Sequence, residues 1–297
     1  MEPLIIEAAI NGATSKRRNP NVPRSAEEIA VDALACFDAG AAVVHNHTDD
    51  IVLGGDGRHD SGAYLRAWEP VLAERPDAIL YPTMSGGAAG RIAIETRYAH
   101  MVELHEAGVL GMAVADPASV NLASRATDGS VAPNSAVYEN SPADIDWMFR
   151  WCREHAVAVH VSIFEPGALR LALGHYEAGT LPAGAKLQFY LMGPRSLSGL
   201  PAEEWALDVY LRLLGDADIP WMVGTPGDDC TATGLSRAAI ERGGHVRVGL
   251  EDYYDPSPAR RQPTNAELVR EVVALAEACG RPVASCAEAR SALVPRG

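Results

Sequence analysis

The sequence has little of what would assign a protein to a class at sight. Only five of its 297 residues are cysteine, an odd number, and no two of them form a Cys-x-x-Cys pair. This argues against a disulfide framework or a structural zinc site and is typical of buried thiols in a reducing compartment. Basic residues are also scarce, with 25 Lys and Arg against 39 Asp and Glu and a net charge of −14. We therefore expect no nucleic acid and no anionic membrane among its partners.

Long apolar runs are absent as well. No segment is long enough to cross a bilayer and no secretory signal pattern begins the chain, so we expect a cytoplasmic protein. No glycine-rich phosphate-binding fingerprint follows the first strand-like run, which argues against the runner-up architecture, an open doubly wound sheet. Residues 293–297 resemble the remnant of an expression tag, and we expect residues 1–292 to form one catalytic domain.

Short apolar runs alternate with longer amphipathic segments along the chain. There are eight of each, the count of a (β/α)8 or TIM barrel, and strands buried on both faces should be apolar along most of their length. The expected strands are Leu4–Ile10, Ala42–His47, Ile79–Met84, Leu110–Val114, Val157–Ile163, Lys186–Met192, Ile219–Val223 and His245–Leu250. The expected helices are Ala26–Ala39, Tyr64–Ala73, Ile92–Ala107, Ala143–His155, Leu169–Ala178, Glu203–Leu214, Leu235–Arg242 and Asn265–Cys279.

Local signals support these pairs. Ser25 and Glu28 form a capping box before the first expected helix, and Gly40 follows its end. Long connections follow the first, second and fourth strands, at residues 11–25, 48–62 and 115–141. These connections belong to the carboxyl ends of the strands, which form the catalytic face of such barrels.

The tripeptide His45-Asn46-His47 ends the second expected strand. Side chains alternate faces along a strand, so the imidazoles of His45 and His47 point the same way and can bind one metal ion. Glu251 and Asp252 follow the eighth strand, and strands eight, one and two are neighbours in a closed barrel. One carboxylate from this pair would complete a two-histidine, one-carboxylate site with positions open for substrate. The alternative is two hydrogen-bonded histidines without a metal.

Arg247 precedes these two acids by four and five residues. A buried arginine needs an acidic partner, and if Glu251 binds the metal, Asp252 is left for Arg247. One interpretation is a salt bridge that closes the barrel. The other is an acid–base or substrate-orienting dyad beside the metal.

Further candidates for substrate binding lie at the same ends of other strands. Ser85, Gly86 and Gly87 follow the third strand, where the exposed amides of a glycine-rich helix start can hold a carboxylate, although a plain turn is equally compatible. The others are Asn11 after the first strand and Asp116 and Asn121 after the fourth.

Five motifs are spread over nearly the whole chain. They are Ala9-Ile10-Asn11-Gly12-Ala13, Asn19-Pro20-Asn21-Val22-Pro23, His45-x-His47, Ser85-Gly86-Gly87 and the long block Gly243–Asp252. Together they resemble the β-keto acid cleavage enzymes, a family whose founding activity is the cleavage of 3-keto-5-aminohexanoate. The resemblance implies a TIM barrel, a zinc ion held by His45, His47 and Glu251, and a working dyad of Arg247 and Asp252.

The same resemblance implies the reaction and the partners. A β-keto acid and acetyl-CoA would give acetoacetate and a new acyl-CoA, with Zn²⁺ as the cofactor and a homo-oligomer, by family habit a tetramer. Two positions depart from the family. Thr14 stands where members carry a glutamate that would answer a substrate amino group, which implies a keto acid without that cation. Met84 stands where they carry a substrate-holding serine, with Ser85 beside it.

Two other functions are compatible with the sequence. The first is a metal-dependent hydrolase or aldolase on the same barrel that uses no CoA. The second is a non-catalytic binding or sensor protein, in which a cluster of metal ligands at the strand ends would be superfluous.

Overall fold

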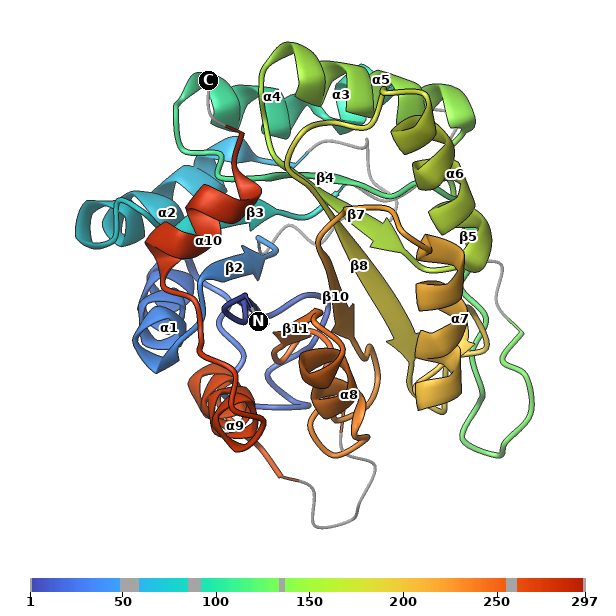
Figure 1. The fold of residues 1–297 in the computed structure, drawn as a ribbon. Coiled ribbons are helices and arrows are strands. Elements are labelled where there is room, and N and C mark those ends of the chain that lie inside the picture. The colour runs from blue at the N-terminus through green and yellow to red at the C-terminus, as the bar shows by residue number, and fades with distance from the viewer. Residues whose placement is uncertain (1, 49–58, 85–91, 134–136, 255–260, 296–297) are drawn as a thin grey trace.

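The computed structural model describes residues 2–48, 59–84, 92–133, 137–254 and 261–295. In these ranges eight parallel strands alternate with helices and curve into a nearly closed barrel, as predicted (Figure 1). The strands of the barrel are β1 (Ile6–Ala9), β2 (Val43–Asn46), β3 (Ile79–Pro82), β4 (Ala113–Ala115), β7 (Val159–Ile163), β8 (Ala185–Met192), β10 (Trp221–Gly224) and β11 (His245–Val248). Each lies at one of the eight expected positions.

The strands pair in parallel in the order β3-β2-β1-β11-β10-β8-β7-β4. The two ends of this order, β3 and β4, contact each other, and the Gly111 N–H before β4 donates to the Leu80 carbonyl of β3 at 3.0 Å. Strands β11, β1 and β2 are therefore consecutive neighbours, which is the arrangement that the metal prediction requires.

Helices surround the sheet (Figure 1). Ser25 caps α1 with the predicted capping box, and Gly40 closes it in the left-handed conformation. The expected helix Ile92–Ala107 is instead two helices separated at Tyr98, and a helix near the C-terminus was not expected. The helices are α1 (Ala26–Ala39), α2 (Ser61–Glu74), α3 (Ile94–Arg97), α4 (Ala99–Glu106), α5 (Pro142–Glu154), α6 (Pro166–Glu177), α7 (Glu204–Leu214), α8 (Leu235–Glu241), α9 (Asn265–Ala278) and α10 (Cys286–Leu293).

Leu293 is the last residue of α10, and it is buried. The assignment of residues 293–297 to an expression tag stays a prediction.

Among the residues that the structure describes, three short strands lie outside the barrel order. β5 (Val120–Asn121) and β6 (Val137–Tyr138) pair antiparallel within the long connection after β4, and β9 (Leu200–Pro201) pairs with the end of β8. The connection after β4 therefore has its own hairpin-like structure at the catalytic face.

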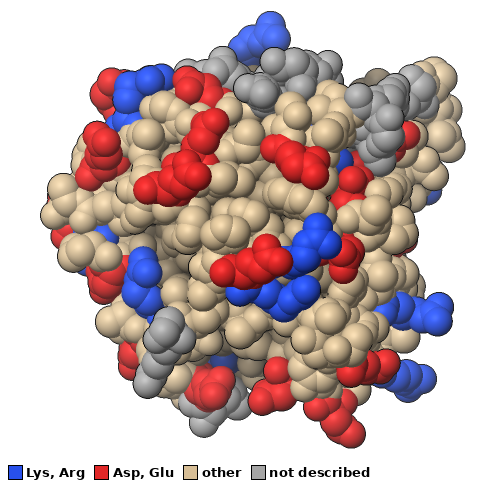
Figure 2. Space-filling view, turned by 90° about the horizontal axis from the view of Figure 1, so that it is seen from above, with Lys and Arg blue, Asp and Glu red and all other residues tan. Residues whose placement is uncertain are grey.

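The outer surface agrees with the acidic composition. On the face seen in Figure 2, Lys and Arg are interspersed with acidic side chains and form no continuous basic surface. None of the helices in the described ranges combines the length and the apolarity needed to cross a membrane.

Candidate active site

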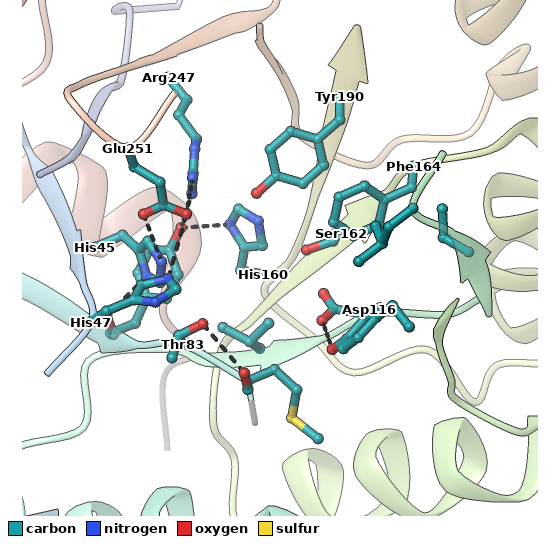
Figure 3. A pocket seen from close by; sticks show the side chains of 16 residues that line it. His45, His47, Thr83, Asp116, His160, Ser162, Phe164, Tyr190, Arg247 and Glu251 are labelled. Atoms are coloured by element: carbon teal, nitrogen blue, oxygen red, sulfur yellow. Dashed lines mark hydrogen bonds and ion pairs between the residues drawn. The ribbon is translucent and has the colours of Figure 1, made fainter. Parts of the chain in front are cut away.

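Three potential metal ligands meet at the ends of β2 and β11. His45 and His47 lie at the end of β2, and Glu251 follows β11 (Figure 3). His45 Nε2 is 3.3 Å from Glu251 Oε2, and His47 Nε2 is 3.5 Å from Glu251 Oε1. One ligand atom from each residue lies within 4.8 Å of the other two. The structure thus brings together the three residues that the sequence assigned to the metal.

Strand register and one glycine place Glu251 beside the histidines. His45 pairs with Ala9 of β1, and β11 lies on the other edge of β1. Gly249 has φ +144°, and a Cβ at this position would lie 2.0 Å from the Ala9 carbonyl oxygen. Another residue would be strained and would clash with β1. The Glu251 N–H then donates to the same carbonyl at 3.1 Å, which holds its side chain next to His45.

Backbone groups fix the two histidines. Nδ1 of His45 is 3.2 Å from the Tyr81 carbonyl oxygen, and since a carbonyl only accepts, Nδ1 carries the proton and Nε2 is free for a metal. Asn11 Oδ1 accepts the N–H of His47 at 2.8 Å, and Asn11 Nδ2 donates to the His47 carbonyl at 3.0 Å. Asn11 is fully buried and positions His47.

The electrostatics of the three residues fit a divalent cation. Burial lowers the pKa of His45, which favours the neutral imidazole that metals bind. Burial alone would raise the pKa of Glu251, but the fixed positive charge of Arg247 helps to hold it well below its usual range. Among the described residues, no hydrogen-bond partner satisfies His47 Nε2 or Glu251 Oε2, although both atoms are buried. Unsatisfied imidazole nitrogen and carboxylate oxygen are the donors of a two-histidine, one-carboxylate metal site.

Arg247 of β11 links the three potential metal ligands to Asp252. Its Nε and Nη2 lie 2.8 and 3.3 Å from the two Asp252 carboxylate oxygens, and Nη2 is also 2.9 Å from Glu251 Oε1. The predicted pair of Arg247 and Asp252 is thus formed, and it is buried. Burial raises the pKa of Asp252, and Arg247 opposes this shift. Arg247 lines the cavity beside the three potential ligands (the main cavity). Asp252 does not line this cavity and instead lines a smaller one.

A buried polar network beneath the metal ligands was not predicted. Glu7 accepts hydrogen bonds from Lys186 Nζ and the Tyr81 hydroxyl, and Arg247 Nη1 lies 3.2 Å from its Oε1. His160 Nδ1 is 3.0 Å from the Tyr81 oxygen. Glu7, Lys186 and His160 stand within or at the start of strand runs that are mostly apolar. A polar or charged residue within an apolar strand could have indicated this network, because a buried charge needs a partner inside the barrel.

A cavity of about 230 Å³ opens beside the metal ligands (Figure 3). Its residues come from or directly follow six of the eight barrel strands, β2, β3, β4, β7, β8 and β11, and others come from the β5–β6 segment. It is lined by His45, His47, Tyr81, Thr83, Met84, Val114, Asp116, Val120, Leu122, Tyr138, His160, Ser162, Phe164, Tyr190, Arg247 and Glu251.

The predicted substrate residues lie in different places. Asp116 lines the cavity, as does Met84. Asn121 is exposed, and alternation along the strand explains this because its neighbours Val120 and Leu122 line the cavity. Thr14 is buried and lines a separate, smaller cavity with Tyr254.

Three further predicted substrate residues, Ser85, Gly86 and Gly87, lie outside the described residues. Substrate contacts of Asn11, Thr14 and Asn121 stay predictions, since these residues are absent from the lining of the main cavity.

A family comparison decides the class of the protein. The family described as beta-keto acid cleavage enzyme matches residues 3–294. The chain belongs to this family. The resemblance seen in the sequence motifs and the expectation of an enzyme that cleaves a carbon–carbon bond and transfers an acyl group are thereby confirmed.

Two relatives match over nearly their whole length. The 3-oxoadipate:acetyl-CoA acetyltransferase of Cupriavidus necator is 32% identical over 297 residues, covering 98% of this chain and 95% of the relative. The 3-keto-5-aminohexanoate cleavage enzyme of Fusobacterium nucleatum is 30% identical over 303 residues, covering 99% and 98%. The names show that members of this β-keto acid cleavage family act on different keto acids.

Solved structures confirm the barrel. ObcA in a ternary complex with a C4-CoA adduct and oxalate superposes with a TM-score of 0.69 at 19% identity, covering 92% of this chain and 67% of ObcA. The 3-dehydroquinate dehydratase of Geobacillus kaustophilus gives a TM-score of 0.50 at 14% identity, with 95% and 93% coverage. At these identities the likeness concerns the fold alone.

Proposed function

We propose that this protein is a zinc-dependent β-keto acid cleavage enzyme that uses acetyl-CoA as its second substrate. The products would be acetoacetate and a new acyl-CoA, formed by retro-Claisen chemistry. Family membership supports the reaction class, and the relative from Cupriavidus necator carries acetyl-CoA in its name. The observation that carries the proposal is the cluster of His45, His47 and Glu251 at the wall of the cavity.

The metal would be held by His45, His47 and Glu251. Imidazole and carboxylate donors with open positions suit zinc, and when bound it supplies a Lewis acid for the ketone and carboxylate oxygens of a β-keto acid. The protein supplies the geometry, because Tyr81 and Asn11 hold the two histidines in place through backbone contacts. Such supporting contacts keep ligands oriented without reorganisation during turnover.

Arg247 is the cationic side chain that reaches both the cavity and the metal ligands. Its charge is fixed, and Asp252 holds the planar guanidinium through two nitrogen atoms. We propose that Arg247 stabilises negative charge that develops on the substrate when the carbon–carbon bond breaks. Asp252 positions Arg247. Its second role, as the base that accepts a proton, stays a prediction from sequence, and the variant Asp252→Asn tests it.

A direct assay tests the proposed reaction. The zinc-loaded protein is incubated with acetyl-CoA and a panel of β-keto acids, and acetoacetate and the new acyl-CoA are measured together. Equal amounts of the two products support the proposal. Consumption of the keto acid at the same rate without acetyl-CoA would instead identify the CoA-independent hydrolase or aldolase.

A further inference from the structure

The main cavity has two chemically different ends. Glu251 and the two histidines lie at one end, and Asp116, Ser162 and Phe164 lie on the opposite side in Figure 3. A keto acid that binds the metal end through its ketone and carboxylate would have room to extend its side chain across the cavity towards Asp116. The residues at this far end set which side chain fits.

Oδ1 of Asp116 has no hydrogen bond of good geometry to a described residue, although the Ser162 hydroxyl lies near enough to lower the pKa of the carboxyl group. The residue follows β4, is only 5% exposed and lines the cavity. Its Oδ2 accepts the hydroxyl hydrogen of Tyr138 from β6, whereas Oδ1 is buried without a hydrogen-bond partner. A buried carboxylate oxygen in this state is costly. A bound molecule with a donor group at this position would remove that cost.

The charges around Asp116 favour a donor over an anion. Among the described residues that line the cavity, Arg247 is the one Lys or Arg, and its ion pairs are with Glu7, Glu251 and Asp252. Burial raises the pKa of Asp116, while Ser162, Tyr138 and the more distant Arg97 and Arg247 lower it. The carboxyl group therefore lacks a close cationic partner of its own.

Part of the cavity lining is apolar. Val114, Val120 and Leu122 contribute to it, and the ring of Phe164 lies near that of Tyr138, with 6.4 Å between the ring centroids. An aliphatic linker of a few carbons would bury its surface against these side chains. Aromatic faces also tolerate a cation beside a carboxylate.

We propose, on the basis of the proposed function, that Asp116 selects a β-keto acid whose side chain ends in a hydrogen-bond donor, an ammonium or a hydroxyl group. The donor binds Asp116 Oδ1, and the keto acid end binds beside His45, His47 and Glu251. A side chain that ends in a carboxylate is disfavoured, because it would place two anions together in a buried pocket. This separates the chain from the Cupriavidus necator relative, whose name gives 3-oxoadipate.

A carboxylate at Asp116 also bears on the substrate expected from Thr14. The missing glutamate at Thr14 removes one possible counter-charge for a substrate cation, but Thr14 does not line the main cavity. Asp116 supplies a carboxylate from a different strand end. A preference for an amino-bearing substrate is therefore compatible with threonine at position 14.

Four keto acids of six carbons test the proposal in the zinc-loaded enzyme with acetyl-CoA. They are 3-oxohexanoate, 5-hydroxy-3-oxohexanoate, 5-amino-3-oxohexanoate and 3-oxoadipate. We expect kcat/KM for at least one donor-bearing acid to exceed that for 3-oxohexanoate by about 10- to 100-fold, the range of a hydrogen bond to a charged group. We expect 3-oxoadipate to be the poorest substrate.

The variant Asp116→Asn keeps the shape and the acceptor for Tyr138 but removes the charge. It should lower the ratio of kcat/KM for 5-amino-3-oxohexanoate to kcat/KM for 3-oxohexanoate by about 10-fold or more. A hydroxyl-bearing substrate should lose less, because its oxygen can accept from the amide NH2 that then stands at the Oδ1 position, whereas an ammonium group cannot accept, so the two donors are distinguished. Asp146→Asn, an exposed carboxylate on α5, is the matched control and should change nothing.

Calorimetry measures the binding of the same four acids in the absence of acetyl-CoA. It tests the role of Asp116 independently of whether the proposed reaction takes place. If no acetoacetate forms but the donor-bearing acids bind more tightly, and Asp116→Asn removes that difference, the reaction is wrong and the role of Asp116 holds. The role of Asp116 is overturned if 3-oxohexanoate or 3-oxoadipate is preferred in both assays. It is equally overturned if Asp116→Asn leaves the order of the four acids unchanged.

Discussion

Glu7 and Lys186 stand 179 residues apart in the chain, and their side chains form an ion pair inside the barrel where neither is exposed. The same Glu7 carboxylate also contacts Tyr81 and Arg247. Through Glu7, this ion pair in the barrel interior is joined to Tyr81 and Arg247, which contact the candidate metal site.

Breaking this ion pair should destabilise the protein strongly. Lys186→Met leaves the Glu7 carboxylate with fewer positive partners in a place that water does not reach, and such changes typically cost about 3–5 kcal/mol. Urea unfolding measures the loss. The double variant Glu7→Gln with Lys186→Met removes both charges and should recover much of it. As the control, Lys16→Met breaks an exposed pair with Glu28 and should cost under about 1 kcal/mol. An equal loss in the two single variants would contradict this account.

The second prediction concerns the metal. His47→Ala and Glu251→Ala each remove one ligand from the cluster, so zinc content and activity should fall together. Elemental analysis after dialysis against a chelator and reloading with zinc gives the occupancy. The neighbouring variant His160→Gln is the comparison, because His160 lines the cavity but lies outside the cluster. Full zinc occupancy in the double variant His47→Ala with Glu251→Ala would refute the ligand assignment.

Asp252→Asn tests the dyad. The substitution keeps the shape of the side chain and one acceptor for Arg247, while it removes a proton acceptor and a charge. Zinc should stay bound, and turnover should fall by roughly 10²-fold or more if proton transfer limits the reaction. Turnover near that of the unchanged enzyme would mean that Asp252 is only a salt-bridge partner. Asp252 contacts Arg247 but does not line the main cavity. The measurement therefore decides between a base and a residue that only positions Arg247.

The barrel and the shared face of His45 and His47 were predictable from sequence because each rests on a periodic or local signal, whereas the choice of Glu251 over Asp252 came from the family resemblance. The spacing of His45 and His47 determines that they share a face, and strand order then brings Glu251 to them. The break at Tyr98 between α3 and α4 carries no glycine or proline that would have marked it.

Contacts between distant segments were less accessible. The partners of Glu7 depend on which residues point into the barrel from strands far away in the chain, and sequence spacing does not give them. The same holds for Asn11, whose side chain hydrogen-bonds to the backbone of His47. For Asp116, position at a strand end predicted the location, whereas its partner Tyr138 came from the β5–β6 segment, which the sequence analysis assigned to a loop.

The last prediction is a pH dependence of stability at the junction of α1 and the strand ends. Asn265 Nδ2 donates to Asp32 at 2.6 Å and to the Ile10 carbonyl at 2.8 Å, and Asn265 Oδ1 accepts from Leu250. Burial raises the pKa of Asp32 to about 7. Because the pKa of Asp32 is higher in the folded protein than in the unfolded chain, the folded protein retains this proton up to a higher pH. The contribution of Asp32 to stability is therefore full at low pH and falls as the pH rises towards about 7.

Asp32→Asn does not titrate and keeps a similar shape, so the comparison isolates this effect. The difference in unfolding free energy between the unchanged protein and Asp32→Asn should decline from about pH 4 to about pH 7 and stay constant above. Urea unfolding at several pH values gives the difference, and Asp38→Asn, an exposed carboxylate on the same helix, is the control. If the difference is independent of pH, or grows with rising pH, Asp32 is ionised in the folded protein and Asn265 holds it as a carboxylate.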